Sequence, residues 1–302
     1  MRFILAGIGN WVPAWDVARI AVIEAEKLGY WGVVLPDQYM WDAKDLGVET
    51  DEGVNSTLDA WIALADLAAR TERINLGTWV TPIPFRPPSM LAKIVSSLDV
   101  MSNGRTILGV GAGSYDRNFE AYSEWNDKKT RVDKTVEGLD LMIQLWTKDR
   151  VNFEGQYYHA KDAILEPKPI QKPYPPLLFG GSGERMLRLA GRYASICYIP
   201  PGGASYEESR DLVLKEASRQ GREDKLSFAA SFAPEFPYKY GSKQFATKVE
   251  EAHGKGCGVF IVPFLFEETA PWLIDESSAQ SQIEYYLGCL SDFARNIIPS
   301  FE

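Results

Sequence analysis

Short apolar runs alternate with amphipathic stretches along most of the chain. An apolar run of about four to eight residues between turn residues is typical of a buried strand, whereas apolar residues spaced three and four apart are typical of one face of a helix. The runs that predict strands lie at residues 2–8, 31–36, 175–181, 194–200, 226–232 and 258–264, with two more inside residues 74–113.

The stretch from Ile74 to Gly113 shows this pattern most clearly. It begins with an apolar run, continues through a Pro-rich break and an amphipathic segment, and ends with a second apolar run closed by glycines. Two buried strands joined by a helix must be parallel, because a parallel pair needs a crossover of about a dozen residues or more. The stretch therefore predicts one βαβ unit.

Repetition of this unit predicts the fold. Eight strands, each followed by a helical pattern, indicate an α/β protein with a closed (β/α)8 barrel, or TIM barrel, and an open doubly wound sheet is the alternative. Ser56 or Thr57 is expected to cap the helix that follows it, and a later helix is expected over Arg131–Trp146. Residues 151–160 alternate around Glu154-Gly155, which predicts a hairpin inside an insertion at about 150–172. We expect residues 1–302 to form one domain.

Composition narrows the possible partners. Lys plus Arg number 32 against 41 for Asp plus Glu, the net charge is −9, and no basic run is clustered, which argues against nucleic acid and anionic membranes as partners. The opening MRFILAGIG is too short for a signal peptide or a membrane span, so we expect a cytoplasmic protein with a small-molecule substrate. His159 and His253 are isolated, and no metal site is expected.

Two glycine-rich segments follow predicted strands, at the strand ends where barrel enzymes place their active sites. Gly111, Ala112 and Gly113 would allow the backbone to approach a flat or phosphorylated ligand closely. A dinucleotide fingerprint is incomplete here, because Ser114 stands where the third glycine belongs. The second segment opens a helix, whose free N–H groups and dipole favour a phosphate. Its residues are Gly180, Gly181, Ser182, Gly183 and Arg185, of which Ser182 and Arg185 add side-chain donors.

Four segments of the chain resemble one protein family. They are LGTWVTPIPFRPPSMLAK, LDVMSNGRTILGVGAG, LWTKDRVNFEGQYYHAKDA and EPKPIQKPYPPLLFGGSGERMLRLAGRYAS. In this order they resemble the bacterial-luciferase-like flavin and deazaflavin oxidoreductases, and the resemblance weakens after about Pro201. It implies a (β/α)8 barrel that binds FMN or coenzyme F420. It also implies a homodimer formed through the second and third helices, which here carry Trp61, Leu64, Met90 and Ile94.

Residues 37–41 resemble a segment of the coenzyme F420-dependent sugar-phosphate dehydrogenases, which carry an Asp-His pair and a nearby Trp. Asp37 and Trp41 match, but Gln38 replaces the histidine. Because a glutamine cannot take a proton near neutral pH, the general-base role of that histidine is missing. Ser114 likewise replaces a glutamate of those dehydrogenases, so the chain is not expected to act on sugar phosphates. Asp37 and Gln38 are the candidate catalytic residues, and Trp41 is a candidate for cofactor contact.

Three further residues are assigned to the cofactor by the resemblance. Trp79-Val80 matches the position where family members hold a non-prolyl cis peptide behind the ring, although an ordinary trans strand end is the alternative. Thr81 is placed to hydrogen-bond the ring, although Thr is also common in strands for its β propensity.

The function that these observations predict is hydride transfer to or from a small organic substrate, with coenzyme F420 favoured over FMN. Coenzyme F420 is favoured because the residue types at Asp37 and Trp41 resemble the deazaflavin-dependent branch of the family more closely. An FMN-dependent monooxygenase is one alternative. A non-catalytic flavin-binding barrel is another, because no convincing acid or base other than Asp37 stands out.

Overall fold

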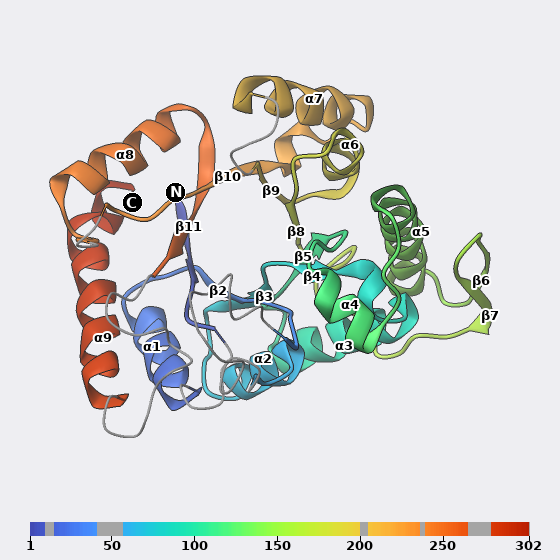
Figure 1. Cartoon of the computed structure of the whole chain (residues 1–302), viewed down its shortest axis with the longest axis horizontal. Coiled ribbons are helices and arrows are strands. Elements are labelled where there is room, and N and C mark those ends of the chain that lie inside the picture. Colours follow the sequence, from blue (N-terminus) through green and yellow to red (C-terminus); the bar gives the residue numbers. More distant parts are fainter. Residues whose placement is uncertain (10–14, 41–56, 200–204, 236–238, 265–278, 302) are drawn as a thin grey trace. The chain divides into compact units, whose positions relative to one another are not determined.

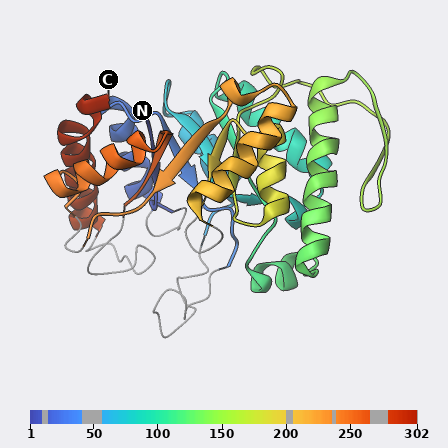
Figure 2. The same cartoon turned by 90° about the horizontal axis from the view of Figure 1, so that it is seen from above.

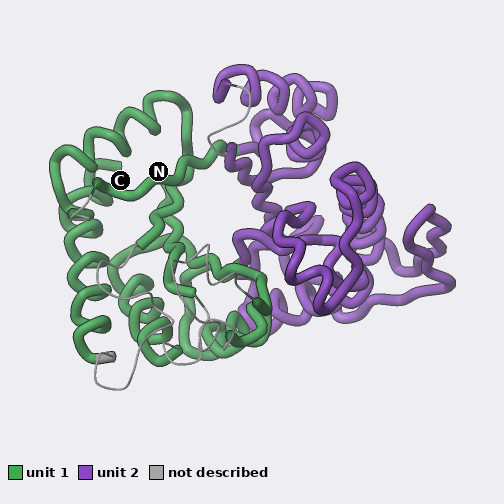
Figure 3. Tube along the Cα trace, in the orientation of Figure 1, with its two compact units in different colours: residues 1–77, 227–302 green, residues 78–226 purple. Residues whose placement is uncertain are grey.

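The predicted alternation of strands and helices is present in the computed structural model, which describes residues 1–9, 15–40, 57–199, 205–235, 239–264 and 279–301. The chain divides into two compact units (Figure 3). Unit 1 comprises residues 1–77 and 227–302, and unit 2 comprises residues 78–226. A single domain over the whole chain stays a prediction.

Unit 1 is built on strands in the order β3-β2-β1-β11-β10. Their bounds are Arg2–Ala6 for β1, Gly32–Leu35 for β2, Asn75–Thr78 for β3, Ser227–Ser231 for β10 and Cys257–Pro263 for β11. β1 is parallel to both β2 and β11, with Ile4 beside Gly32 and Ile261. Residues 3–6 and 32–35 are buried without interruption, as expected of parallel strands covered on both faces.

The described residues of unit 1 include the helices α1 (Trp15–Lys27), α2 (Ala60–Ala68), α8 (Lys243–Gly254) and α9 (Ala279–Asn296), with a short η4 turn (Ile298–Phe301). α1 and α9 pack side by side (Figure 1). The predicted cap of α2 was wrong for Thr57, whose hydroxyl donates to the Tyr39 carbonyl, and Ser56 lies outside the described residues. Asp59 is the cap, because its carboxylate accepts from the Trp61 and Ile62 N–H groups at 2.9 and 3.1 Å.

Unit 2 contains strands in the order β9-β8-β5-β4, and each adjacent pair is parallel. Their bounds are Thr81–Pro82 for β4, Thr106–Gly111 for β5, Leu177–Gly180 for β8 and Ile196–Tyr198 for β9. In register, Val110 lies beside Phe179, and Gly180 lies beside Tyr198. The glycine-rich ends of β5 and β8 therefore belong to neighbouring strands that run in the same direction.

The helices of unit 2 are α3 (Pro88–Met101), α4 (Asp116–Tyr122), α5 (Lys128–Thr147), α6 (Glu184–Tyr193) and α7 (Tyr206–Arg219), with short turns η1 (Ile83–Phe85) and η2 (Glu223–Lys225). α4 is a short helix that the sequence analysis did not predict. α5 begins earlier than the predicted Arg131, because the Asp127 carboxylate caps its first turn by accepting from the Thr130 N–H at 3.0 Å.

The predicted hairpin is present as β6 (Val151–Glu154) and β7 (His159–Ala163), which pair antiparallel. It runs back alongside α5 (Figure 2). Glu137 of α5 holds the turn, because its carboxylate accepts from the N–H groups of Gln156, Tyr157 and Tyr158 at 2.6–2.9 Å. The insertion is thus fastened to the helix that precedes it.

Candidate functional site

Val80 covers two of the predicted glycines. The peptide bond between Trp79 and Val80 is cis, as the family resemblance implied. A Cβ placed on Gly111 would lie 2.6 Å from Val80 Cγ2, and one placed on Gly180 would lie 3.2 Å from Val80 Cγ1. These distances are shorter than ordinary van der Waals contacts, so the Val80 isopropyl group fits only because both strands end in glycine. A ligand contact at Gly111 stays a prediction.

Gly113 has a similar neighbour. Its φ is 85°, and an added Cβ would lie 2.5 Å from the ring of Phe119 on α4. The Phe119 ring contacts Phe85 and Trp125 edge-on or tilted, with centroids 5.3 and 5.5 Å away. The glycine loop therefore passes over an aromatic cluster, and the half-buried Ala112 lies within that loop.

Trp79 is held by a residue that the sequence analysis missed. Its ring packs edge-to-face on Tyr198, with centroids 5.2 Å apart and planes at 78°. Tyr198 is the last residue of β9 and lies beside Gly180 in the parallel ladder. We call Trp79, Val80, Gly111, Gly180 and Tyr198 the strand-end strip. A polar aromatic residue at the end of an apolar run was the available signal for Tyr198.

Thr81 has a structural partner within unit 2. Its side chain is fully buried, and its Oγ1 lies 2.9 Å from Thr78 Oγ1. The Gly109 N–H donates to the same Thr78 oxygen at 3.2 Å. The two threonines therefore link neighbouring strands, and a bond from Thr81 to a cofactor ring stays a prediction.

The segment before α6 has the geometry of an anion site. Gly183 occupies the N-cap and no side chain caps the helix, so the first-turn N–H groups lack a side-chain partner. A Cβ on Gly183 would meet nothing within 4 Å, and Ser182 is exposed. Gly181 has a φ of 152°, a value that favours glycine. A phosphate group would find space and backbone donors here.

Arg185 lies on the first turn of α6 and forms an ion pair with Asp133 of α5. Lys129 also contacts that carboxylate, at 2.8 Å. Hydrogen bonds from Lys129 and then Arg185 lower the pKa of Asp133, so the carboxylate stays ionised. The Arg185 side chain is still 49% exposed, and a guanidinium has five N–H donors, so a second anion can bind it as well.

Asp37 and Gln38 follow β2 in unit 1. The Asp37 side chain is 2% exposed, and its Oδ2 accepts from Trp61 Nε1 at 3.1 Å. The next turn is tied to the same helix, because the Tyr39 hydroxyl donates to Asp59 at 2.8 Å. Gln38 is half-buried and has no hydrogen bond within the described part of the chain. Trp41 lies outside the described residues.

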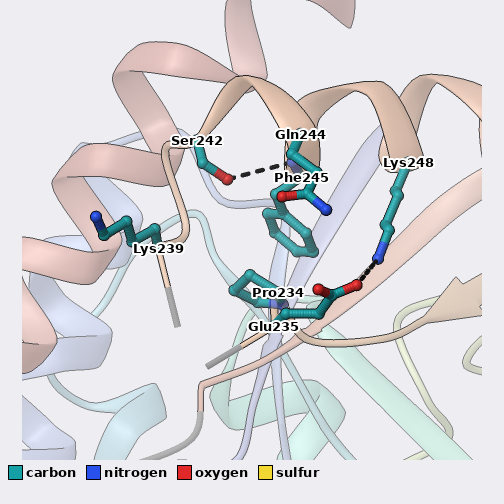
Figure 4. Close-up of a pocket in the computed structure, with 7 residues that line it drawn as sticks. All are labelled: Pro234, Glu235, Lys239, Ser242, Gln244, Phe245 and Lys248. Carbon is teal, nitrogen blue, oxygen red and sulfur yellow. Dashed lines mark hydrogen bonds and ion pairs between the residues drawn. The ribbon is translucent and has the colours of Figure 1, made fainter. Parts of the chain in front are cut away.

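A pocket of about 180 Å³ lies elsewhere in unit 1, at the start of α8 (Figure 4). Its lining comprises Pro234, Glu235, Lys239, Ser242, Gln244, Phe245 and Lys248. Ser242 Oγ accepts from the Phe245 N–H at 3.2 Å, and Lys248 pairs with Glu235 at 2.8 Å. None of the residues predicted from the sequence lines this pocket.

The described residues contain no group of three or more His, Cys, Asp or Glu side chains arranged to hold a metal ion. Their helices include none with the length and apolar character needed to cross a bilayer.

Curated relatives match this chain over part of their length. An F420-dependent glucose-6-phosphate dehydrogenase of Microbacterium testaceum is 36% identical over 192 residues, which is 63% of this chain and 54% of that protein. A phthiodiolone/phenolphthiodiolone dimycocerosates ketoreductase of Mycobacterium sp. (strain JLS) is 28% identical over 242 residues, which is 72% of this chain and 61% of that protein. The chain spans about half the length of the dehydrogenases it matches.

Solved structures share the fold over the whole chain. An F420-dependent secondary alcohol dehydrogenase superposes with a TM-score of 0.75 at 20% identity, covering 100% of both chains. The monooxygenase RslO1 from Streptomyces bottropensis gives a TM-score of 0.74 at 19% identity, also covering 100% of both chains. These likenesses confirm the predicted (β/α)8 barrel. The family model for luciferase-like monooxygenases matches residues 7–235, so this chain belongs to the luciferase-like monooxygenase family, as its sequence motifs predicted.

Proposed function

We propose that this protein is a coenzyme F420-dependent oxidoreductase that transfers hydride to or from a small organic substrate. The packing of Val80 against Gly111 and Gly180 carries the proposal, because it sets an apolar side chain over side-chain-free backbone at the strand ends where barrel enzymes bind their ligands. The similarity to proteins described as F420-dependent glucose-6-phosphate dehydrogenases supports the same cofactor.

The described residues of unit 2 fit a flat cofactor that carries a phosphate. Trp79 and Val80 are half-buried, so each retains surface on which a ring can pack. The uncapped start of α6 offers N–H groups and the positive end of a helix dipole to the phosphate. When bound, such a cofactor supplies the hydride chemistry, and the chain supplies orientation and exclusion of water.

Ser182 and Arg185 complete the proposed phosphate contacts. The Ser182 hydroxyl is exposed and can donate to a phosphate oxygen. Arg185 is shared between Asp133 and the phosphate, with the carboxylate fixing the direction of the guanidinium. A pre-positioned guanidinium loses less side-chain entropy on binding than a free one.

Asp37 and Gln38 are proposed to act as a pair with separate roles. The buried Asp37 carboxylate holds the backbone after β2 through Trp61, so its proposed role is to position Gln38. The Gln38 amide can both donate and accept hydrogen bonds, which suits the orientation of a substrate but not proton abstraction near neutral pH. We therefore assign neither Asp37 nor Gln38 the role of an acid or base that exchanges a proton with the substrate.

The decisive experiment compares cofactors on the purified full-length chain. Coenzyme F420 and FMN are titrated separately, and the loaded protein is then assayed for reduction of an electron acceptor with and without oxygen. Tight F420 binding with turnover in the absence of oxygen is expected. Tight FMN binding without F420 binding reverses the choice and makes a monooxygenase the better assignment, and binding without any turnover favours a non-catalytic flavin-binding barrel.

A homodimer is also proposed, with a revised set of surface residues. Trp61 and Leu64 are 3% and 0% exposed within unit 1, so the prediction that they lie in a dimer interface was wrong. Trp61 faces inward, where its Nε1 donates to the buried Asp37 carboxylate at 3.1 Å. Ile62 on α2 and Met90 on α3 are 69% and 60% exposed and are available to a second copy. Cytoplasmic location stays a prediction.

A further inference from the structure

Tyr198 lies next to two other members of the strand-end strip. It pairs with Gly180 in the β8–β9 ladder, and it contacts the Trp79 ring edge-to-face. The side-chain-free Gly180 separates it from Val80, whose Cγ1 lies 3.2 Å from the point where a Gly180 Cβ would stand. The phenol is thus the polar group that lies next to the proposed ring-binding surface.

The Tyr198 hydroxyl has no hydrogen-bond partner among the described residues. Two buried tyrosines have such partners inside the protein, since the hydroxyls of Tyr30 and Tyr240 donate to the Leu290 and Pro263 carbonyls at 3.2 and 2.8 Å. Tyrosine hydroxyls that are removed from water usually find such a partner. A half-buried phenol at a barrel strand end is therefore a donor available to a ligand.

The surroundings of Tyr198 select the kind of ligand. The other members of the strand-end strip are two glycines, Val80 and Trp79, none of which is charged. The arginines of α6, Arg185, Arg188 and Arg192, are paired with Asp133, Glu184 and Glu216. Burial raises the pKa of Tyr198, so the phenol keeps its proton at neutral pH. An uncharged oxygen acceptor suits this environment better than a phosphate.

We propose that Tyr198 is a specificity-determining residue that donates its phenolic O–H to the oxygen of a small, uncharged carbonyl substrate or of the corresponding alcohol. This inference rests on the proposed function and deepens it by naming the substrate class. The hydrogen bond orients the carbonyl or carbinol carbon over the ring-binding surface and requires no transfer of the phenolic proton. The Trp79 contact fixes the direction of the phenol.

The test compares Tyr198→Phe with Tyr174→Phe in the full chain. Phenylalanine keeps the ring but removes the O–H. Tyr174 is a matched control because it is also half-buried, and its ring centroid lies 6.0 Å from that of Trp146. With cyclohexanone as the probe and reduced coenzyme F420 as the hydride donor, we expect Tyr198→Phe to raise the KM for cyclohexanone about 3- to 10-fold, the effect of one lost neutral hydrogen bond. The F420 dissociation constant should change by less than about twofold, and Tyr174→Phe should change neither constant.

A second readout is independent of turnover. Addition of cyclohexanone to the F420-loaded protein should perturb the tyrosine band in the near-ultraviolet difference spectrum, and this change should vanish in Tyr198→Phe but persist in Tyr174→Phe. An unchanged KM and difference spectrum in Tyr198→Phe overturn the inference while leaving F420 binding intact. Turnover of glucose 6-phosphate in place of neutral ketones overturns the substrate class. Failure of the unsubstituted protein to bind F420 overturns the proposed function, and the inference falls with it.

Discussion

The isopropyl group of Val80 occupies the space that a side chain at Gly111 would need. An added Cβ would approach Val80 Cγ2 to 2.6 Å, closer than real Cβ contacts come. Gly111 is the last residue of β5, and Val80 directly precedes β4, so the contact joins two segments of unit 2 that are 31 positions apart in the chain. This contact fixes the position of the apolar Val80 side chain over Gly111.

Gly111→Ala tests this contact. The added methyl group must displace Val80, and we expect a loss of about 1–3 kcal/mol in the free energy of unfolding, typical of overpacking. Denaturant unfolding measures the loss, and F420 titration of the folded variant should show weaker binding. Gly258→Ala on β11 is the control, because its Cβ would make only ordinary contacts, at 3.6 Å and beyond. Equal stability and affinity in both variants would contradict the packing argument.

The double substitution Ser182→Ala with Arg185→Ala tests the phosphate site. We expect F420 affinity to weaken by roughly 2–4 kcal/mol, from the loss of two polar or charge-assisted bonds. Calorimetric titration at two salt concentrations measures the change, which should shrink at high salt because the lost contact is partly electrostatic. Arg70→Ala removes a comparable exposed arginine, paired with Asp66 at 2.9 Å, and should leave affinity unchanged. Unaltered affinity in the double variant removes this loop from the site.

The association state tests the exposed apolar residues. Met90 on α3 is 60% exposed, and we expect Met90→Glu to shift a dimer toward monomer, because a carboxylate in a packed interface would lose its hydration. Sedimentation velocity measures the distribution. Glu120→Gln, at an exposed site on α4, should leave the distribution unchanged. A monomer in the unsubstituted protein contradicts the dimer proposal.

The carboxylate of Glu26 on α1 gives a pH-dependent contribution to stability. It accepts from the N–H groups of Glu72, Arg73 and Ile74 at 2.9, 2.6 and 3.0 Å. Burial opposes ionisation, but these hydrogen bonds outweigh it, and the pKa of Glu26 lies below its ordinary value of 4.5. Because the folded pKa is depressed, the stabilisation is present above about pH 4.5 and is lost as pH falls through the folded value.

Glu26→Gln should therefore lower stability at pH 7 and flatten its acid dependence. We expect about 1 kcal/mol at neutral pH, since the partly exposed site is screened by solvent. Urea unfolding at pH 7 and pH 3 measures both effects. Glu24→Gln removes a surface ion pair with Lys27 on the same helix and should cost less than about 0.5 kcal/mol. A Glu26 variant that behaves like the Glu24 variant argues against the three hydrogen bonds.

The sequence by itself determined the strands, the hairpin at Glu154-Gly155 and the family. Strand burial and helix amphipathicity recur every few residues, so the apolar runs and their spacing are visible without a fold. The glycines at 111 and 180 were visible for the same reason, because glycine after an apolar run marks a strand end or a close approach.

Only the tertiary structure decided what those residues contact. It placed Val80 against Gly111, Tyr198 against Trp79 and Arg185 beside Asp133, in each case joining residues from different elements. It also gave the cap of α2 to Asp59 in place of Thr57, because the helix begins at Ala60 and the Thr57 hydroxyl donates to the Tyr39 carbonyl. The local pattern of apolar and polar residues predicts which residues are buried. Strand order and register decide which residues each of them contacts, because they bring together positions far apart in the chain.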